Sequence, residues 1–526
     1  MLRARTATTM KVFARLLALL LAMLTVLVLV VACDDSSDPN ADEGGSSGLI
    51  DERYDVNGRL NDDLPDTLNY EGETISFMTW GDVENPEFEQ ENVTGDNVRD
   101  AIYDRNNQIE DRLNVELKWT SVPGPYPASG GTAPYIGHVD AIYQANTQDY
   151  DIIASHSRSQ GLLAIQGYFY NLATIENSYM DLEKPWWPQQ LVETVSFGTG
   201  GYYFVSGDMS TNVLYMMHMM YINKDLFSKY QIDIPYQEVY DGKWTMDRLI
   251  EITSDKYVDK DNDNTRSQND QYGFGALDYV MDSFYIASNL RWVDEDEKEW
   301  LVLSPDYTSS KTVKLVNKLG DWINTDSCWA WNGALDPQDL HRGEHMKNFK
   351  EGNMLVLMQH SQYAGKSLLN ADFEYGLLPN PKYDENQVNY YTGMGNPFSL
   401  YSIFLDFKDR GDKAATLTML TAVLECYASE GYRLTTPEIF EVNMQLKYAA
   451  GQDETNMFEY IRSGITFDIG KIFASDLSNI CTLPAQAMCA NASWSSTSGA
   501  YKRAITAKLA DIVEGFQEYQ AMRDNK

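Results

Sequence analysis

A twelve-residue segment, 259–270, places oxygen-bearing side chains at alternate positions, which is the spacing of a calcium-binding loop. Asp259, Asp261 and Asp263 supply carboxylates at positions 1, 3 and 5, Thr265 supplies a backbone carbonyl at position 7, and Asp270 supplies the acid at position 12. Calcium is a large, hard cation that takes about six to eight oxygen ligands, so it suits a tightly coiled acidic loop. We therefore expect a structural Ca²⁺ site here, with a solvated, metal-free acidic loop as the alternative.

Two residues depart from the usual pattern of such a loop. Asn264 stands where glycine is preferred, and Asp270 replaces the longer glutamate. Asparagine tolerates positive φ better than most residues, so the sharp turn remains accessible to the chain.

Aromatic and planar polar side chains could together hold a sugar. Sugars present apolar C–H faces and a rim of hydroxyls, which suits aromatic platforms beside Asp, Glu, Asn, Gln or Arg groups. The chain has 11 Trp and 34 Tyr, so platforms are available. Most aromatic side chains pack in the core, however, and position in the fold must select the candidates.

The elements that position these side chains begin with a repeated strand–helix pattern. Apolar runs at residues 74–80, 115–119 and 151–154 indicate buried strands, and residues 97–113 and 137–145 have helical periodicity. This order predicts a parallel sheet covered by helices, an α/β fold. Ligands of such sheets bind beyond the carboxyl ends of the strands.

Candidate ligand-binding residues in the first part of the chain follow from that rule. Trp80 and Asp82 come at the end of the first strand, and Ser155 and His156 come at the end of the third.

The later part of the chain adds further strand-end candidates. Residues 214–222 form an apolar run that we predict to be another buried strand. Tyr279 and Asp282 follow the strand after the acidic loop, and His360 follows the apolar run 354–358. We expect these side chains to contact the ligand.

The N-terminus resembles a bacterial lipoprotein signal. A basic stretch without acids precedes the apolar residues 16–31, a run of signal-peptide length that is short for a membrane-spanning helix. It ends just before Cys33, as in the lipobox, whose cysteine is lipidated. We expect residues 1–32 to be a signal peptide, Cys33 to carry lipid and residues 33–69 to be a flexible tether. An uncleaved anchor is the alternative, and both place the chain outside the cytoplasm.

Charge, length and cysteine content narrow the class of protein. The net charge of −36 would repel nucleic acid, so nucleic acid is not expected as a partner. A chain of 526 residues is too long for a single hydrophobic core, so we expect at least two lobes. Four cysteines besides Cys33 permit disulfides, the shortest loop being that of Cys481 and Cys489. No nucleophile-elbow, zinc-protease, P-loop or dinucleotide motif occurs, so we expect no enzyme.

Besides the lipobox, seven short segments of the chain occur in a specific order: 151–153 (DII), 161–163 (GLL), 171–172 (NL), 221–226 (YINKDL), 242–245 (GKWT), 349–353 (FKEGN) and 375–381 (YGLLPNP). In these segments and their order the chain resembles bacterial extracellular solute-binding proteins of family 1, the carbohydrate-binding lipoproteins of ABC importers. Related proteins often carry an acidic calcium loop just before Tyr-Gly-Phe, and residues 272–274 have that sequence.

The resemblance implies a periplasmic-binding-protein-like fold of type II, in which two discontinuous α/β lobes are joined by a hinge. The ligand lies between the lobes, and closure signals occupancy to the permease. By analogy the chain crosses near residues 205–207, near His360 and near Phe407. The implied lobes are residues 70–205 plus 361–407, and residues 206–360 plus 408–526.

The resemblance also implies two more ligand contacts and a function. It places Asp208 at the first crossing, and Trp494 before a helix that presents an aromatic side chain to the sugar. The implied protein is a monomer, anchored to the membrane through Cys33, that captures a carbohydrate for ABC permease subunits. The length of the chain favours an oligosaccharide. Alternatives are a binding protein for a peptide or other polar solute, a sugar sensor without transport, and a lipid-anchored glycoside hydrolase with paired carboxylates.

Overall fold

The computed structural model describes residues 53–81, 83–124, 132–147, 149–196, 201–331, 344–368, 371–405, 412–445 and 451–524. The predicted signal peptide, Cys33, Asp82 and the crossing at Phe407 lie outside the described residues. Residues 53–526 belong to one compact unit. None of the described helices combines the length and apolar character that crossing a lipid bilayer requires.

The first sheet contains the strands expected near the N-terminus. Its order is β11 (Ser399–Ile403), β3 (Ile152–His156), β1 (Glu73–Trp80) and β2 (Val115–Val122). β1 is parallel to β2 and β3, and β11 runs antiparallel to β3. α2 (Asn97–Leu113) and α3 (Ala133–Ala145) connect the three parallel strands. The predicted strand–helix–strand–helix–strand order is confirmed.

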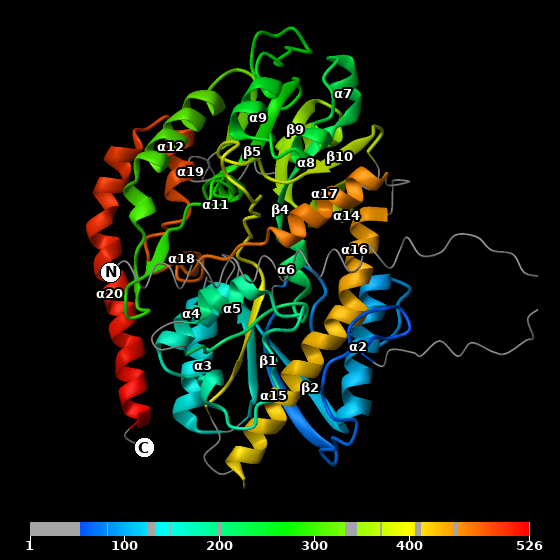
Figure 1. Ribbon diagram of the computed structural model, residues 1–526, viewed down its shortest axis with the longest axis vertical. Coiled ribbons are helices and arrows are strands. Elements are labelled where there is room, and N and C mark those ends of the chain that lie inside the picture. The colour runs from blue at the N-terminus through cyan, green and yellow to red at the C-terminus, as the bar shows by residue number, and fades with distance from the viewer. Residues whose placement is uncertain are drawn as a thin grey trace, which may run out of the picture. The chain divides into compact units, whose positions relative to one another are not determined.

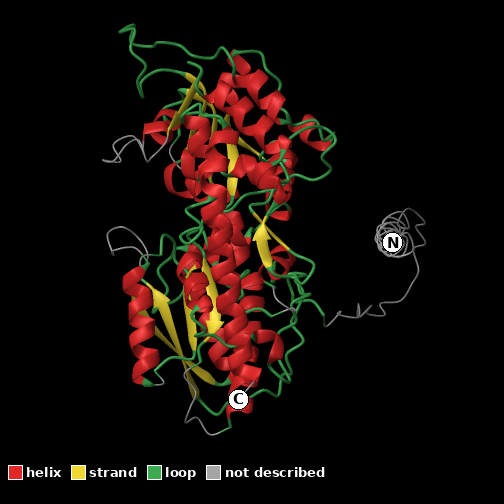
Figure 2. Ribbon diagram, turned by 90° about the vertical axis from the view of Figure 1, so that its left-hand side faces the viewer, coloured by secondary structure: helices red, strands yellow, loops and turns green. Residues whose placement is uncertain are grey.

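The second sheet has five strands, in the order β10 (Tyr375–Leu378), β4 (His218–Asn223), β9 (Met354–His360), β5 (Tyr272–Leu277) and β8 (Cys328–Trp331). β5 is parallel to β8 and β9, whereas β4 runs antiparallel to β9 and β10. Helices surround both groups of strands (Figure 2). The apolar run predicted as one strand, residues 214–222, is divided: its first two residues end α6 (Thr211–Tyr215), and β4 begins at His218.

Two of the passages between the sheets lie side by side. The outward passage leaves Val205, which bridges Tyr401 of β11, and reaches β4. The return passage is residues 379–398, between β10 and β11. Met217 bridges Met394 in antiparallel fashion, so the two passages are hydrogen-bonded to each other.

The position of the return passage differs from the expectation of a crossing at His360. β10 pairs with β4 in the second sheet, so residues 361–378 do not leave that sheet, although they were assigned to the first lobe. The apolar sequence of β10 predicts a buried strand but not the neighbour with which it pairs.

The chain after β11 contacts elements of both sheets in turn. α15 (Lys413–Glu430) packs on α2, α17 (Gln452–Ser463) on β10, α18 (Ile469–Ile472) on α4 (Ser157–Ile165), and α19 (Leu483–Cys489) on α12 (Ser310–Ile323). α20 (Trp494–Asp524) contacts both α12 and α4 (Figure 1). The expected assignment of residues 408–526 to one lobe does not match these contacts, because periodicity identifies a helix without indicating which sheet it covers.

Residues 53–69 belong to the folded unit and not to the expected tether. The Asp62 side chain is fully buried and its Oδ1 lies 2.5 Å from Arg112 Nη2. Burial alone would raise the pKa of Asp62, but hydrogen bonds from Arg112 and Ser429 and the charges of Arg112 and Arg433 lower it to about 2. These ion pairs fix the segment, and the polar composition that suggested a tether cannot reveal them.

The remaining described elements are α5 (Gln189–Val195), α7 (Lys224–Lys229), α8 (Tyr236–Tyr240), α9 (Met246–Thr253), α10 (Asp278–Met281), α11 (Ser283–Ala287), α13 (Glu344–Lys350), α14 (Gln362–Ser367), α16 (Thr436–Gln445), the short pair β6 (Val293–Glu295) and β7 (Leu301–Leu303), the 3₁₀ turns η2 (Leu172–Thr174) and η3 (Pro305–Thr308), and the π-helical turn η5 (Gly431–Thr435).

Candidate functional site

A pocket of about 720 Å³ lies where strands of both sheets end. His156 is the last residue of β3, His360 is the last residue of β9, and both line the pocket. Parallel strands place their carboxyl ends at one edge of a sheet, which is where α/β sheets bind ligands. The described lining residues are Glu84, Thr132, His156, Arg158, Tyr279, Asp282, Met346, Gln359, His360, Gln362, Tyr363, Lys366, Ser367, Gly395, Asn396, Pro397, Lys471, Ser475, Cys481 and Thr482.

The predicted ligand-binding residues divide into two groups. Those that line the pocket are His156, Tyr279, Asp282 and His360. Those that are buried elsewhere in the described structure are Trp80, Ser155, Asp208 and Trp494. Asp82 lies outside the described residues.

Trp80 and Ser155 do not line the pocket but contact residues in or next to its lining. The Trp80 indole N–H donates to Ser399 Oγ at 2.8 Å, and its ring packs edge-on against the His156 ring with centroids 5.3 Å apart. The Ser155 hydroxyl donates to the Gln160 side-chain oxygen. Both residues therefore hold the end of β3 in place.

Asp208 and Trp494 take part in packing away from the pocket. Asp208 Oδ2 lies 3.6 Å from Arg462 Nη2, and burial raises the pKa of Asp208 to about 6 against the opposing charge of Arg462. The Trp494 indole N–H donates to Tyr307 O at 2.9 Å, and the side chain has no exposed surface. Both residues therefore stabilise contacts between segments that are distant in the sequence.

A buried ion pair forms part of the pocket wall. Lys471 Nζ, on α18, lies 2.5 Å from Asp282 Oδ2, which follows α10. The other oxygen, Asp282 Oδ1, lies 3.5 Å from His218 Nδ1 and has no hydrogen bond to a described residue. Burial raises the pKa of Asp282, while the charges of Lys471 and Arg158 oppose that rise. The pair joins α18 to the second sheet, and Asp282 Oδ1 is buried beside His218.

Three aromatic rings pack at the end of β9. The Tyr279 and His360 rings stack with centroids 5.5 Å apart, and the His218 ring lies 4.7 Å from the His360 ring. Gly395 of the return passage lies against His360: a Cβ atom there would be 2.7 Å from His360 Nε2. A side chain at position 395 would therefore displace the His360 ring, against which the return passage packs.

The β3 side of the pocket combines a neutral histidine with an arginine. His156 Nδ1 accepts a hydrogen bond from Arg158 N at 3.2 Å and so caps α4. Burial, and then the charge of Arg158, lower the pKa of His156 to about 3. With the Asn396 amide oxygen facing Arg158, that oxygen accepts hydrogen bonds from Arg158 Nε and Nη2, both at 2.6 Å. The guanidinium thus bridges α4 and the return passage.

The outer edge of the pocket carries a second polar group. Lys366 Nζ donates to Glu84 O at 2.9 Å and to Gln362 Oε1 at 2.8 Å, and Gln362 Nε2 donates to Glu84 Oε2 at 2.9 Å. These contacts connect the loop after β1 with α14, so elements associated with both sheets meet at the entrance.

Sequence reasoning missed several polar lining residues. Ligands of parallel sheets bind beyond the carboxyl ends of the strands, which we call the strand-end rule. Arg158 follows His156 by two positions and Gln359 precedes His360, so this rule could have found both residues. Asn396 and Lys471 lie in segments with no strand or helix signal that would place them near β3 or β5. Cys481 also lines the pocket; its thiol donates to Gly470 O at 3.4 Å. Cys328, Cys426, Cys481 and Cys489 form no disulfide.

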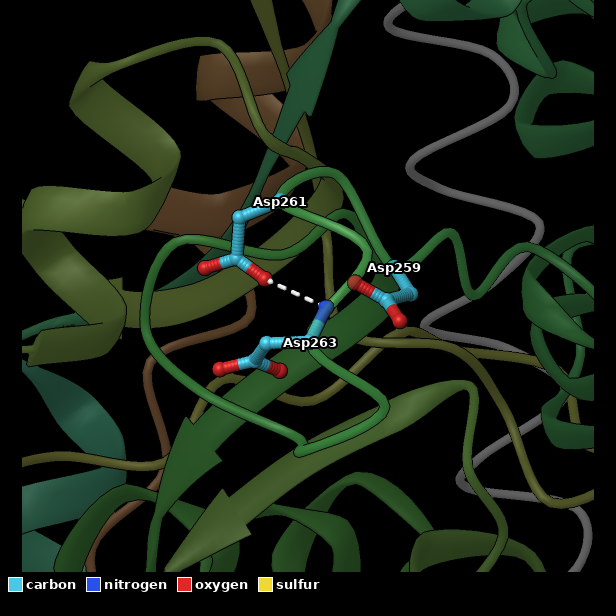
Figure 3. A group of neighbouring side chains, drawn as sticks. All are labelled: Asp259, Asp261 and Asp263. Atoms are coloured by element: carbon cyan, nitrogen blue, oxygen red, sulfur yellow. Dashed lines mark hydrogen bonds between the residues drawn. The ribbon is translucent and has the colours of Figure 1, made fainter.

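The acidic loop brings three of its predicted metal ligands together. Asp259, Asp261 and Asp263 each offer a carboxylate oxygen within 4.8 Å of the others (Figure 3). The loop is coiled by backbone N–H groups that donate to these carboxylates, including Asn264 N to Asp259 Oδ2 at 2.9 Å. Asn264 has φ of +59°, the conformation for which glycine is preferred. The oxygen-only donor set suits a hard cation such as Ca²⁺.

The other two predicted ligands have different surroundings. Asp270 is fully buried, and its oxygens accept hydrogen bonds from Lys260 N at 3.0 Å and Ser267 N at 2.9 Å. It closes the loop and is not part of the three-carboxylate cluster. Thr265 N donates to Asp263 Oδ1 at 2.7 Å. Desolvation and the charges of its acidic neighbours raise the pKa of Asp261, and a cation would relieve the repulsion.

The fold is that of solute-binding proteins of ABC transporters. No protein-family model and no curated protein sequence matches the chain. Its structure is similar to a cyclo/maltodextrin-binding protein solved with maltotetraose, at a TM-score of 0.52 and 14% identity over 84% of this chain and 98% of that one. It is also similar to an ABC substrate-binding protein from Listeria monocytogenes, solved in complex with cycloalternan. The TM-score is 0.51, and the sequence identity is 12% over 84% of this chain and 99% of that one.

A third solved structure is a sugar transporter from Rhizobium etli in an open conformation, with a TM-score of 0.52 and 14% identity over 84% of this chain and 99% of that one. The similarity thus extends over nearly the full length of each of these proteins. It establishes the mixed α/β, periplasmic-binding-protein-like architecture.

Proposed function

We propose that the protein is an extracellular, lipid-anchored monomer that captures a carbohydrate, in particular an oligosaccharide, for an ABC importer. The observation that carries this proposal is the pocket itself. It lies at the carboxyl ends of strands from both sheets and is bounded by the return passage at Gly395 and Asn396. Its volume of about 720 Å³ is in the range of small-molecule binding sites.

The chemistry of the lining suits hydroxyl groups and sugar faces. Tyr279 offers a partly exposed ring, and tyrosine rings can pack on the apolar face of a sugar. Gln359 and Asn396 supply planar amides to the lining, and Asp282 supplies a carboxylate. Sugar hydroxyls act as donors and acceptors at once, so they can satisfy such groups together.

The arrangement of the passages suits closure around a guest. The outward and return passages are hydrogen-bonded at Met217 and Met394, next to the pocket. Small backbone rotations in such short connections can move two rigid halves as units. We propose that the ligand stabilises the closed form, which the permease then recognises.

Calorimetric titration of the full chain with a panel of neutral and charged oligosaccharides tests capture. We expect at least one saccharide to bind, and Tyr279→Ala to weaken that binding. Tyr501→Ala, in the exposed part of α20, is the control and leaves affinity unchanged. If only peptides, amino acids or other polar solutes bind, the carbohydrate proposal is wrong.

Lipid attachment is tested separately in cells. Growth with a labelled fatty acid should label the wild-type chain, whereas Cys33→Ser should remain unlabelled. Equal labelling of the two chains would contradict anchorage through Cys33.

We also propose that the acidic loop binds Ca²⁺ in a structural role, with Asp259, Asp261 and Asp263 as ligands. Their convergence and the coiled backbone support this role. Adding Ca²⁺ to chelator-treated protein should raise its melting temperature, and Asp261→Asn should abolish the rise. An unchanged melting temperature for the wild type would remove the proposal.

A further inference from the structure

One side of the pocket is formed by residues 395–397 of the return passage, which we call the floor segment. Asn396 and Pro397 are half-buried, and Gly395 is buried. A ligand in the pocket would therefore lie against the chain that joins the two sheets. The position of the floor segment should then affect how well the ligand fits.

The floor segment is attached at its beginning to the chain that enters the second sheet. Gly395 N donates to Met216 O at 2.8 Å, and His218 N donates to Gly393 O at 2.9 Å. His218 is the first residue of β4. Up to Gly395, therefore, the return passage is held from the side of the second sheet.

The following residues are attached to the first sheet through α4, the helix that follows β3. Ser157, the first residue of α4, donates from its hydroxyl to Asn396 O at 2.8 Å and from its backbone N–H to Phe398 O at 3.0 Å. The attachment thus changes from one sheet to the other between Gly395 and Asn396. Because hinges are short stretches whose backbone angles change, a movement of the two halves would be absorbed near this point of the return passage.

Ser157 does not belong to the surface that meets a ligand. Its side chain is fully buried and does not line the pocket. Asn396 O also accepts a hydrogen bond from Phe398 N at 2.8 Å, so removal of the Ser157 hydroxyl leaves this carbonyl paired. The chain can therefore fold without the hydroxyl, while the floor segment loses one of its attachments.

We propose that Ser157 is a positioning residue for the pocket, and that its hydroxyl fixes the floor segment in the position that suits the ligand. The inference rests on the proposed function and adds a residue that acts on the ligand only through Asn396. A pocket whose parts are already in place loses less free energy to ordering when the ligand binds. When the fitting conformation is only partly populated, the apparent affinity falls in proportion.

Hydrogen exchange followed by mass spectrometry tests the attachment without any ligand. In the full chain, Ser157→Ala should speed exchange in peptides that contain residues 393–398. Ser159→Ala is the matched control, because this serine is equally buried in α4 and its hydroxyl has no hydrogen bond to a described residue. Exchange in the control should equal that of the wild type. Equal exchange in Ser157→Ala as well would overturn the proposed attachment.

Calorimetric titration tests the role of Ser157 in binding. The probes are linear tetrasaccharides of glucose, mannose, xylose and galacturonic acid, and the variants are compared with the probe that binds the wild type most tightly. We expect Ser157→Ala to weaken binding roughly twofold to tenfold, the effect of one neutral hydrogen bond. Ser159→Ala should bind as the wild type does. A lower melting temperature with unchanged affinity in Ser157→Ala would show a structural role alone and overturn the positioning role.

The outcomes separate this inference from the proposed function. If no saccharide binds, carbohydrate capture is wrong, and the exchange comparison still decides whether Ser157 fixes the floor segment. If saccharides bind and both variants match the wild type, capture stands and the positioning role is wrong. Equal losses of affinity in the two serine variants would assign the effect to the packing of α4 and contradict the role of the Ser157 hydroxyl.

Discussion

Lys471 and Asp282 form a buried ion pair across elements that are 189 residues apart in the sequence, with 2.5 Å between Nζ and Oδ2. Only 11% of the lysine side chain and 3% of the aspartate side chain are exposed. The pair therefore connects α18 with the segment that follows α10, and it also forms part of the pocket wall.

We predict that Lys471→Met destabilises the protein at pH 8 by about 3–5 kcal/mol, because Asp282 would remain buried without its cation. The double variant Asp282→Asn/Lys471→Met should recover much of this loss. Urea denaturation measures the free energy of unfolding. Lys318→Met, which breaks an exposed contact with Asp247, should cost less than about 1 kcal/mol. Similar losses of unfolding free energy in Lys471→Met and Lys318→Met would contradict a stabilising role of the buried ion pair.

Gly395→Ala should disturb the His360 ring. The added methyl would lie 2.7 Å from His360 Nε2, and such overpacking costs about 1–3 kcal/mol. Both the melting temperature and the affinity for the saccharide should fall. Gly499→Ala is the matched control, because a Cβ there meets no atom within 4 Å and the position lies in α20. Unaltered binding by the Gly395 variant would show that the contact has no role.

Trp494→Phe distinguishes packing from ligand contact. The family resemblance assigned Trp494 to the sugar, but its indole N–H donates to Tyr307 O and the side chain is fully buried. We expect a loss of stability of about 1–3 kcal/mol, from the removed hydrogen bond and the unpaired carbonyl, with unchanged saccharide affinity. Tyr279→Ala should show the opposite pattern. A large loss of affinity in the folded Trp494 variant would restore the original assignment.

Glu425 should give stability a specific dependence on pH. It accepts hydrogen bonds from the indole N–H groups of Trp186 and Trp187, but burial dominates and raises its pKa to about 7. Between about pH 4.5 and 7 the folded state holds a proton that the unfolded state has released. The contribution of this group is therefore complete below about pH 4.5 and is lost as the pH rises toward 7.

Glu425→Gln removes that titration. The stability of the wild type minus that of the variant should decrease from about pH 5 to pH 7 in a series of urea denaturations. Glu183→Gln, at an exposed position near Trp186, is the matched control for the loss of one carboxylate. A flat difference for Glu425→Gln would contradict the raised pKa.

Periodicity and the strand-end rule predicted the elements best where the chain is locally regular. The first three strands and their helices formed as expected, and His156, Tyr279, Asp282 and His360 line the pocket because each ends or follows a strand. Trp80 ends a strand too, but its side chain points into packing with Ser399 and His156. The rule predicts the edge of the sheet and not the direction of a side chain.

Partners distant in sequence were beyond prediction. Lys471 meets Asp282 and Asn396 meets Arg158 only through the way in which the chain passes repeatedly between the sheets. The lobe boundaries drawn by analogy missed the same feature, since β10 pairs with β4 and α15 packs on α2. Similarly, the polar composition around Asp62 predicts a tether, and the sequence cannot show that Asp62 pairs with Arg433, far along the chain.

The proposed function requires a saccharide to occupy the pocket between the end of β3 and the end of β9. A crystal structure of the full chain with its tightest-binding saccharide would show where the sugar binds. We predict sugar density that contacts the His156–Arg158 side and the Tyr279–His360 side at once. Sugar density elsewhere on the protein, with this pocket filled only by water, would contradict carbohydrate capture in the pocket.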